Sequence, residues 1–321
     1  EPTTNPAFVV LRERPPPSFY WRAVREIVEV WEATEATRGR GVVRSYKDGR
    51  GLIGAAAATA WRPRDRTYEV LAYRPHELWG RPRTVEPESV IEMDRAFAST
   101  FNNYDYESRR SVITPRSPCP VLLGIRGDDP LPLPDAFERI RGERAERWFV
   151  FETNQGTDDH VVQRFPTRPR TTVRFRGSVT RSPRTLRGGH VVFGVGVFDA
   201  MVYEPAKGFR RLVRQLAPGD TVEVVAAVRD SPRTLNVEKL EVKALADILV
   251  KAANPECPRC GVRARSRGRL AGFRCRRCGR RFPPRAAVYV RATRDIVPGW
   301  YEPPVGSRRH LSKPLKRELR N

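Results

Sequence analysis

The sequence predicts a multidomain protein of the α+β class, and three observations support this. The chain has 321 residues, whereas single hydrophobic cores rarely grow beyond about 250 residues. Hydrophobic residues make up 39% of it, enough to pack cores, while 29 Pro and 23 Gly indicate many turns and short elements. Strand-like and helix-like segments alternate from residue 63 to 163, and strand-like segments dominate from 166 to 243.

The N-terminal segment, residues 1–62, is expected to form a small unit of its own. Apolar side chains recur at helical spacing from Trp21 to Ala33, which predicts an amphipathic helix. A predicted strand over residues 42–46 is followed by the GxGxxG sequence that starts at Gly49 and opens a small-residue helix over 55–60. Backbone amides at such a helix start can hold phosphate. Glycines that allow close packing of an Ala-rich helix explain the motif equally well.

Residues 63–163 are expected to form an α+β unit, and residues 164–250 a small β-barrel. The first segment alternates predicted strands (68–73, 111–114, 121–125 and 148–151) with predicted helices (88–98 and 134–141). In the second, strand patterns through 173–179 and 190–203 precede a helix over 206–216 and strands over 221–228 and 235–242. Three strands, a helix and two strands is the order of an OB-fold. An SH3-like or other small barrel is the alternative.

Four cysteines predict a zinc ribbon within residues 251–285. Two CxxC-Gly turns are separated by 14 residues, and two such turns place four thiolates at the corners of a tetrahedron. The expected zinc ligands are Cys257, Cys260, Cys275 and Cys278. A pair of disulfides is the alternative, but the chain shows no secretion signal. Arg263, Arg265, Arg267, Arg269 and Arg274 are expected on the surface of this ribbon.

The net charge of +23 points to nucleic acid as the partner. Each phosphate that a Lys or Arg neutralises releases counterions and favours binding. Between Lys251 and Asn321 there are 20 basic residues and four acidic ones, and the segment from Arg164 to Gly189 contains eight Arg and no acid. Only seven of the 60 basic residues are Lys, which a GC-rich or thermophilic genome also explains.

Without an apolar run of about 18 residues, the chain is expected to be soluble and cytoplasmic.

Two polar clusters and one odd cysteine remain. Met93-Asp94 with Thr100 to Asp105 and the segment from Thr153 to His160 carry acids and amides of the kind that hold a metal-bound triphosphate or a cationic substrate. Turn and capping roles are the alternative. Cys119 lies between two prolines, and none of the four His forms a recognisable catalytic pair with it. We expect it to be an inert, buried thiol.

In order along the chain, these segments resemble the archaeal tRNA(Ile) 2-agmatinylcytidine synthetases. The most specific motifs are Thr100 to Asp105 (TFNNYD) and Tyr203-Glu204-Pro205 with Lys207, Phe209 and Arg210. Further matching motifs are Thr4-Asn5-Pro6, Gly49 to Ala55, Met93-Asp94, Pro120 to Gly127, Thr153 to Asp158, Gly188 to Val191, the two CxxC turns, Trp300 to Pro304 and Arg308 to Leu311. The resemblance therefore extends from one end of the chain to the other.

The resemblance implies an ATP-dependent ligase that joins agmatine to the wobble cytidine of the isoleucine tRNA, with anticodon CAU, that reads AUA. Its domains would be part of a kinase-like domain (1–62), a ferredoxin-like domain (63–163), an OB-fold (164–250), a zinc ribbon (251–285) and a basic tail (286–321) that packs back. A target base must leave its stack to be modified, which fits a basic clamp beside a polar pocket.

The resemblance and the charge pattern together assign candidate site residues. Asp94 and Asp105 are the candidate catalytic residues beside dicationic agmatine. The candidates for binding ATP, with Mg²⁺, are Gly49, Arg50, Gly51, Gly54, Asn102 and Asn103. The candidates for binding RNA are Arg174, Arg176, His190, Tyr203, Lys207, Arg210, Arg265, Arg267 and Arg274.

Two departures from the family pattern lead to a further expectation. The Asp-rich opening strand and turn of the family, with its nearby threonine, have no counterpart here, and Cys119 stands where the family has an Asp between prolines. We therefore expect this polypeptide on its own to bind tRNA but to modify it poorly or not at all. The competing hypothesis is a non-catalytic module that binds tRNA or single-stranded nucleic acid, for which an OB-fold and a zinc ribbon suffice.

Overall fold

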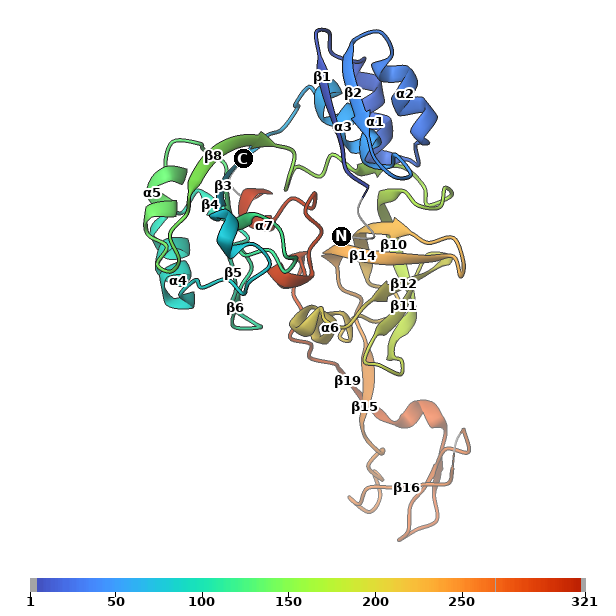
Figure 1. Ribbon diagram of the computed structural model, residues 1–321. Coiled ribbons are helices and arrows are strands. Elements are labelled where there is room, and N and C mark those ends of the chain that lie inside the picture. Colours follow the sequence, from blue (N-terminus) through green and yellow to red (C-terminus); the bar gives the residue numbers. More distant parts are fainter. Residues whose placement is uncertain (1–4, 269, 319–321) are drawn as a thin grey trace.

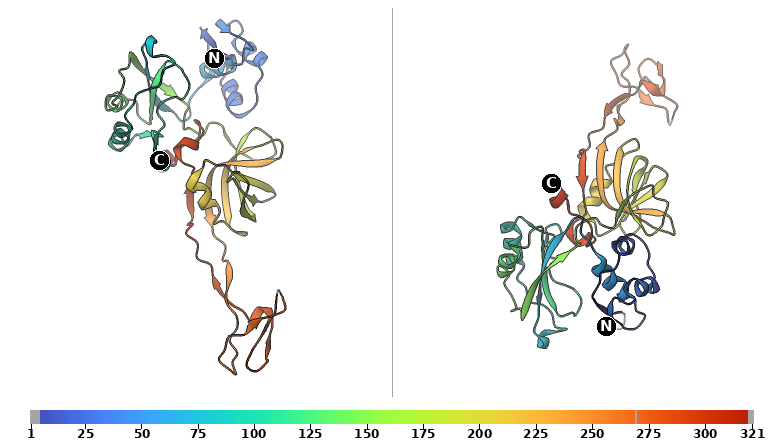
Figure 2. Two further views of the ribbon diagram at one scale, coloured as in Figure 1. Left: turned by 60° about the horizontal axis from the view of Figure 1, so that its bottom comes forward. Right: turned by 90° about the horizontal axis from the view of Figure 1, so that it is seen from above.

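The structure, a computed structural model, describes residues 5–268 and 270–318 (Figure 1). It contains an N-terminal helical unit, a four-stranded α+β unit, a β-barrel and a small distal ribbon, with a C-terminal segment that returns to the centre (Figures 1 and 2). The prediction of a multidomain protein with mixed α and β elements is confirmed. No helix in the described residues is long and apolar enough to span a membrane.

The N-terminal unit packs three helices against a two-stranded sheet. Its elements are β1 (Ala7–Leu11), α1 (Pro17–Arg25), α2 (Val30–Thr37), β2 (Gly41–Ser45) and α3 (Gly51–Ala60). The single helix expected over Trp21 to Ala33 is wrong, because the chain leaves helical geometry at Glu26 and restarts after Glu29. Glu29 and Glu32 form a reciprocal capping box, which satisfies free amides at the start of the second helix.

Two glycines of the GxGxxG turn occupy positions where the backbone geometry requires glycine. Gly49 has a φ of 71°, a conformation that favours glycine. A Cβ added to Gly51 would lie 2.0 Å from the backbone oxygen of Asn5, so only glycine allows α3 to approach the start of β1. The helix also begins at Gly51, four residues before the expected start at Ala55. Backbone conformation therefore accounts for Gly49, and close packing for Gly51.

The second unit has the strand order β4-β7-β3-β8 with antiparallel neighbours. Its elements are β3 (Thr67–Tyr73), η1 (His76–Leu78), α4 (Pro87–Ala96), β4 (Thr100–Phe101), β7 (Val121–Gly127), α5 (Leu133–Glu138) and β8 (Arg147–Thr153). Residues of α4 and α5 share one core with β3 and β7, so both helices cover the same face of the sheet. This is the β-α-β-β-α-β arrangement of a ferredoxin-like unit.

The strand expected over 111–114 is shorter than predicted and lies outside this sheet. β6 (Arg110–Ser111) pairs only with β5 (Tyr104–Asp105), forming a two-stranded hairpin. Beyond this hairpin, the amide of Val112 donates to the oxygen of Asn103 and the amide of Gly124 in β7 donates to the oxygen of Ile113, without a continuous strand ladder to β7. The hairpin is therefore a separate two-stranded sheet next to β7.

The barrel closes because β10 pairs with strands on both sides. Its elements are β10 (Thr172–Thr185), β11 (Val191–Val195), β12 (Phe198–Val202), α6 (Lys207–Val213), β13 (Thr221–Val228) and β14 (Thr234–Ala244). β10 is antiparallel to both β11 and β13, β14 is antiparallel to β13, and β12 runs parallel to β14. Five strands with a helix between the third and fourth is the predicted OB-fold arrangement. β9 (Val161–Gln163) and β20 (Gly299–Tyr301) extend its edges.

A two-stranded stalk carries the distal ribbon away from the barrel (Figures 1 and 2). The stalk pairs β15 (Leu249–Ala253) with β19 (Val288–Arg291), and most of its residues are exposed. The ribbon contains β16 (Arg265–Ser266), β17 (Phe273–Arg274), β18 (Arg281–Phe282) and η2 (Pro284–Ala286). The chain thus leaves and re-enters the barrel through the same stalk.

The C-terminal segment, residues 299–318, joins the barrel to the α+β unit. It contains η3 (Val305–Ser307) and α7 (Leu315–Glu318). Lys239 of β14 is fully buried, and its ammonium lies 2.6 Å from Asp158 and 3.6 Å from Glu318. Arg317 donates to both oxygens of Asp65 and to Asp128. A buried network of ion pairs therefore holds the segment in place.

We predict that Lys239→Met destabilises the protein by about 3 kcal/mol, because it leaves the partly buried carboxylate of Asp158 without its cation and removes one of the two cations beside Glu318. Lys243→Met is the matched control on the same strand, since Lys243 is partly exposed and its ion pair in the described residues is with Glu241. That control should cost less than about 1 kcal/mol. Urea unfolding of both variants measures the difference, and equal losses would contradict the proposed role of Lys239.

Candidate functional site

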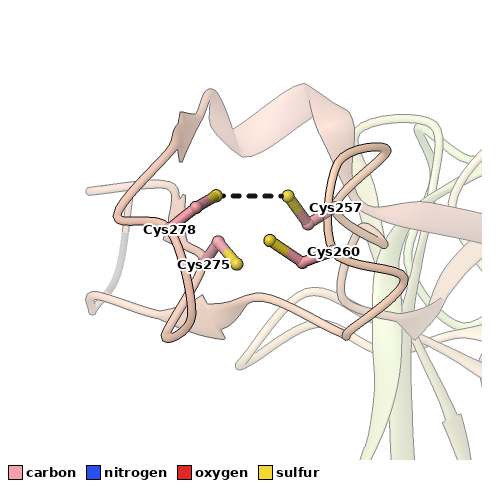
Figure 3. Close-up of side chains that lie close together, drawn as sticks. All are labelled: Cys257, Cys260, Cys275 and Cys278. Atoms are coloured by element: carbon pink, nitrogen blue, oxygen red, sulfur yellow. Dashed lines mark hydrogen bonds between the residues drawn. The ribbon is translucent and has the colours of Figure 1, made fainter.

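The four predicted zinc ligands face one another within the ribbon (Figure 3). Their sulfur atoms all lie within 4.8 Å of one another, and Cys257 and Cys278 are 3.6 Å apart. That separation is far longer than a disulfide bond of about 2 Å, and all four cysteines are free. Four thiols at such separations are the ligand set of a structural zinc ion, which is tetrahedral. The residues present therefore fit zinc, which would hold the two turns together.

Local hydrogen bonds shape each cysteine turn for this purpose. The amides of Cys260 and Gly261 donate to the oxygen of Cys257, and the amide of Gly279 donates to the oxygen of Cys275. Gly261 and Gly279 have φ angles of 62° and 74°, which glycine adopts without strain. The apolar cluster beneath the turns is small, comprising Ala264, Phe273, Phe282 and Ala287. So small a core needs the metal to hold its fold.

The ribbon presents a strongly basic surface around the metal site. Arg263, Arg265, Arg267 and Arg274 are exposed, as the sequence predicted, while Arg269 lies outside the described residues. Three of these arginines (Arg265, Arg267 and Arg274) border one open hollow of about 420 Å³ that reaches Cys275. Exposed guanidinium groups around an open hollow can contact the phosphates of a polyanion.

On the barrel, the predicted RNA-binding residues divide into exposed and internally bonded groups. The His190 ring accepts a hydrogen bond from the amide of Glu204 and lies edge-on to Tyr203 at 5.1 Å. Arg210 pairs with Glu204 at 2.8 Å and donates to the oxygen of Gly189. The two motifs that carry these residues thus form one cluster, in which Arg210 and His190 hold the loops together while the nearby Lys207 is exposed.

Arg174 and Arg176 lie close together on β10 but have different surroundings. Arg174 is half-buried, contacts Glu318 at 3.3 Å and stacks over Trp300 at 5.2 Å, so it holds the C-terminal segment. Arg176 is exposed. The exposed guanidinium of Arg176 is therefore more accessible to an external phosphate than that of Arg174.

The candidate catalytic acids are tied into internal hydrogen bonds. Asp94 accepts from the side-chain amide of Asn103 at 2.9 Å and from the hydroxyl of Tyr106 at 2.8 Å. Asp105 is buried and accepts from the amides of Ser108 and Gly306. These contacts stabilise turns, which is the structural role that the sequence analysis gave as the alternative to ligand binding. The role of both acids beside agmatine stays a prediction.

The candidate ATP residues do not meet in one place. Gly54 lines a pocket of about 440 Å³ between the N-terminal unit and the α+β unit, together with Tyr20 and Asn154. Asn102 instead lines a different pocket and accepts a hydrogen bond from Arg308 at 2.9 Å. Asn103 is buried against Asp94. The predicted residues thus have separate locations, and their role in binding ATP stays a prediction.

A larger pocket lies between the sheet of the α+β unit and the C-terminal segment, and sequence analysis did not find it. Its volume is about 500 Å³, with β3 and β7 on one side and hairpin β5–β6 and residues 305–310 around it. Five arginines line it, so we call it the arginine pocket: Arg110, Arg116, Arg126, Arg308 and Arg309. Three of the segments that resemble the family, at 120–127, 153–158 and 308–311, contribute residues to it. That all three belong to the family pattern was the one sign in the sequence that they could share a site.

A chain of polar contacts crosses the arginine pocket. Arg126 lies 3.0 Å from Glu69, whose other oxygen accepts from the side-chain amide of Gln155 at 2.6 Å. The oxygen of Gln155 lies 3.2 Å from Nδ1 of His310. Burial and the positive charge of Arg126 lower the pKa of His310 below its usual value, although Glu69 opposes this. The shift favours the neutral form of the His310 ring.

Two family models match the chain. One, described as the TiaS FLD domain, matches residues 49–160, and one described as the TiaS C-terminal zinc ribbon domain matches residues 254–296. The first match starts inside the N-terminal unit, within the turn before α3, and the second includes the returning stalk strand β19. The domain boundaries predicted from the sequence stay predictions.

Curated relatives and solved structures match almost the whole chain. The isoleucine-tRNA 2-agmatinylcytidine synthetase TiaS of Methanocaldococcus jannaschii is 40% identical over 98% of this chain and 77% of the relative. That of Methanosarcina mazei is 41% identical over 94% of this chain and 73% of the relative. The crystal structure of TiaS in complex with its isoleucine tRNA and ATP superposes with a TM-score of 0.83 at 36% identity, covering 94% of this chain and 72% of that chain. The structure of a complex of TiaS with the same tRNA, AMPCPP and agmatine superposes with a TM-score of 0.81 at 35% identity, and it covers the same shares of the two chains.

We predict that a Cys257→Ser, Cys260→Ser double variant binds no zinc and loses the folded ribbon, because two hydroxyls replace thiolates in a four-thiolate site. Metal analysis of the purified chain and limited proteolysis between residues 254 and 296 measure both effects. Cys119→Ser is the matched control, since Cys119 lies outside the cluster beside Arg83. Full zinc content in the double variant would contradict the assignment.

Proposed function

The chain belongs to the TiaS family of isoleucine-tRNA 2-agmatinylcytidine synthetases, and we propose that it joins agmatine to the AUA-decoding isoleucine tRNA in an ATP-dependent reaction. The product is 2-agmatinylcytidine at the wobble position of that tRNA. The reaction forms a carbon–nitrogen bond, so the protein is a ligase. Its substrates are tRNA, agmatine and ATP, with structural zinc in the ribbon.

The observation that carries this proposal is the extent of the similarity. Identity of 40% over 98% of the chain spans the N-terminal unit, the α+β unit, the barrel and the ribbon together. A module that only bound RNA would require only the barrel and the ribbon. The chain spans about three quarters of the length of these relatives. The solved TiaS complexes contain isoleucine tRNA with ATP, or with AMPCPP and agmatine.

The charge distribution supports different roles for the units. Exposed arginines of the ribbon, with Arg176 and Lys207 of the barrel, offer accessible cations to the RNA backbone. The polar motifs around Asp94, Asp105 and Asn154 lie instead in the α+β unit, so the chemistry is proposed to occur there. A tRNA-modifying enzyme works where its tRNA is, which makes a cytoplasmic location part of the same proposal.

The direct test is agmatine incorporation. Labelled agmatine, ATP and zinc-loaded protein are incubated with isoleucine tRNA transcripts that carry either a CAU or a GAU anticodon. Label is expected in the CAU transcript only, and only with ATP. Because the chain spans about three quarters of the length of these relatives, a parallel reaction also contains the part of a relative that the chain does not match.

Binding of tRNA without incorporation in either reaction would refute the ligase proposal and support the non-catalytic module. Incorporation into both transcripts would refute the specificity for the CAU anticodon but retain the ligase. A gel-shift measurement on the same samples separates loss of binding from loss of chemistry.

A second prediction concerns the RNA-binding surface of the ribbon. Replacing Arg265, Arg267 and Arg274 by Gln should weaken tRNA binding and reduce the slope of log affinity against log salt by about 3, because about one counterion is released per phosphate contact. Replacing the exposed Arg139, Arg144 and Arg147 of the α+β unit by Gln removes the same charge and is the matched control. Equal slopes for the two variants would show that only net charge matters.

A further inference from the structure

The arginine pocket differs from the basic surface of the ribbon because its guanidinium groups surround a cavity. Three of its five arginines are already neutralised by carboxylates at close range. The pairs are Arg126 with Glu69 at 3.0 Å, Arg308 with Glu302 at 2.8 Å and Arg309 with Glu238 at 2.8 Å. These pairs fix the walls of the pocket and leave little net charge of their own.

The other two arginines, Arg110 and Arg116, supply the excess positive charge. Within residues 5–268 and 270–318, no carboxylate forms an ion pair with either of them within 4.0 Å. The contact of Arg110 is a weak one, from its guanidinium to the backbone oxygen of Gly306 at 3.5 Å. Arg116 is exposed at the rim. An anion that entered the pocket would therefore meet two cations without carboxylate partners.

Buried donors beside the cavity indicate a place for that anion. The Nε atom of Arg110 and the hydroxyl of Ser111 are buried, and neither has a hydrogen-bond partner among the described residues. Both residues form β6, whose hairpin is held against the C-terminal segment by the bond from the amide of Gly306 to Asp105. A buried donor without a hydrogen-bond partner destabilises the folded protein, and a bound acceptor that supplies the missing hydrogen bond removes this penalty. Guanidinium and hydroxyl donors together suit phosphate oxygens.

We propose that the arginine pocket binds a phosphate group, contacted by Arg110, Ser111 and Arg116. The proposal rests on the proposed function, in which both a nucleotide and an RNA are substrates, and it names a subsite for one of them. The same charge excess disfavours dicationic agmatine in this pocket. The phosphate comes either from the polyphosphate of ATP or from the RNA backbone.

Binding measurements with an Arg110→Gln, Arg116→Gln double variant test the proposal. The probes are inorganic triphosphate, ATP and a transcript of the AUA-decoding isoleucine tRNA, titrated without agmatine so that no turnover is needed. Arg109→Gln is the matched control, because Arg109 is exposed, precedes Arg110 directly and does not line the pocket. Since neither replaced arginine has a carboxylate partner in the described residues, thermal unfolding should be unchanged.

The double variant is expected to lose at least about tenfold in affinity for one class of probe, while the control changes less than about twofold. Loss for triphosphate and ATP together assigns the pocket to the nucleotide. Loss for tRNA, with a salt slope smaller by about 2, assigns it to the RNA backbone. Unchanged affinity for all three probes would overturn the proposal. Because the assay measures binding without agmatine, its result is independent of whether the chain completes the ligation.

Discussion

The burial of Lys239 is the constraint on which the arrangement of the units depends. A lysine with no exposed surface is tolerated only when carboxylates surround it, and those carboxylates come from two different regions. Asp158 belongs to the loop after the α+β unit, and Glu318 to the C-terminal segment. Arg317 of the same segment is likewise paired with carboxylates of the α+β unit and the loop before it, Asp128 and Asp65. Satisfying these charges requires sheet, barrel and C-terminal segment to meet in one geometry, which also places residues 305–310 over the sheet and so creates the arginine pocket.

Local patterns in the sequence predicted the elements whose cause is local. The strand over 221–228 has the predicted bounds, because its alternating apolar residues face a barrel core. The cysteine turns converge because spacing and glycine geometry dictate it. The arginine pocket was not predicted, because its contacts join residues that are remote in sequence. Gln155 meets Glu69 across 86 positions and His310 across 155, and no local periodicity encodes such meetings.

The polar motif from Thr100 to Asp105 shows how a functional signal and a structural role overlap. From the sequence, its amides and acids indicated ligand binding. In the structure, Asn103 and Asp94 hold α4 against the following turn, while Asp105 holds hairpin β5–β6 to the C-terminal segment. These side chains thus position a pocket wall. Residue type could not distinguish a group that touches a ligand from one that orients the wall around it, because both demand the same hydrogen-bonding atoms.

The path of the chain through the stalk has a consequence for biosynthesis. The ribbon is inserted between β14 and β20, so the barrel strands β10 to β14, the stalk and the metal ligands are all synthesised before residues 299–318. During translation, the segment that closes the arginine pocket and contributes Glu318 to Lys239 therefore emerges after the barrel and the ribbon. A nascent chain that stalls within the ribbon would have a folded barrel and an RNA-attracting surface but no closed pocket. The order of synthesis thus prevents an unfinished chain from assembling this pocket.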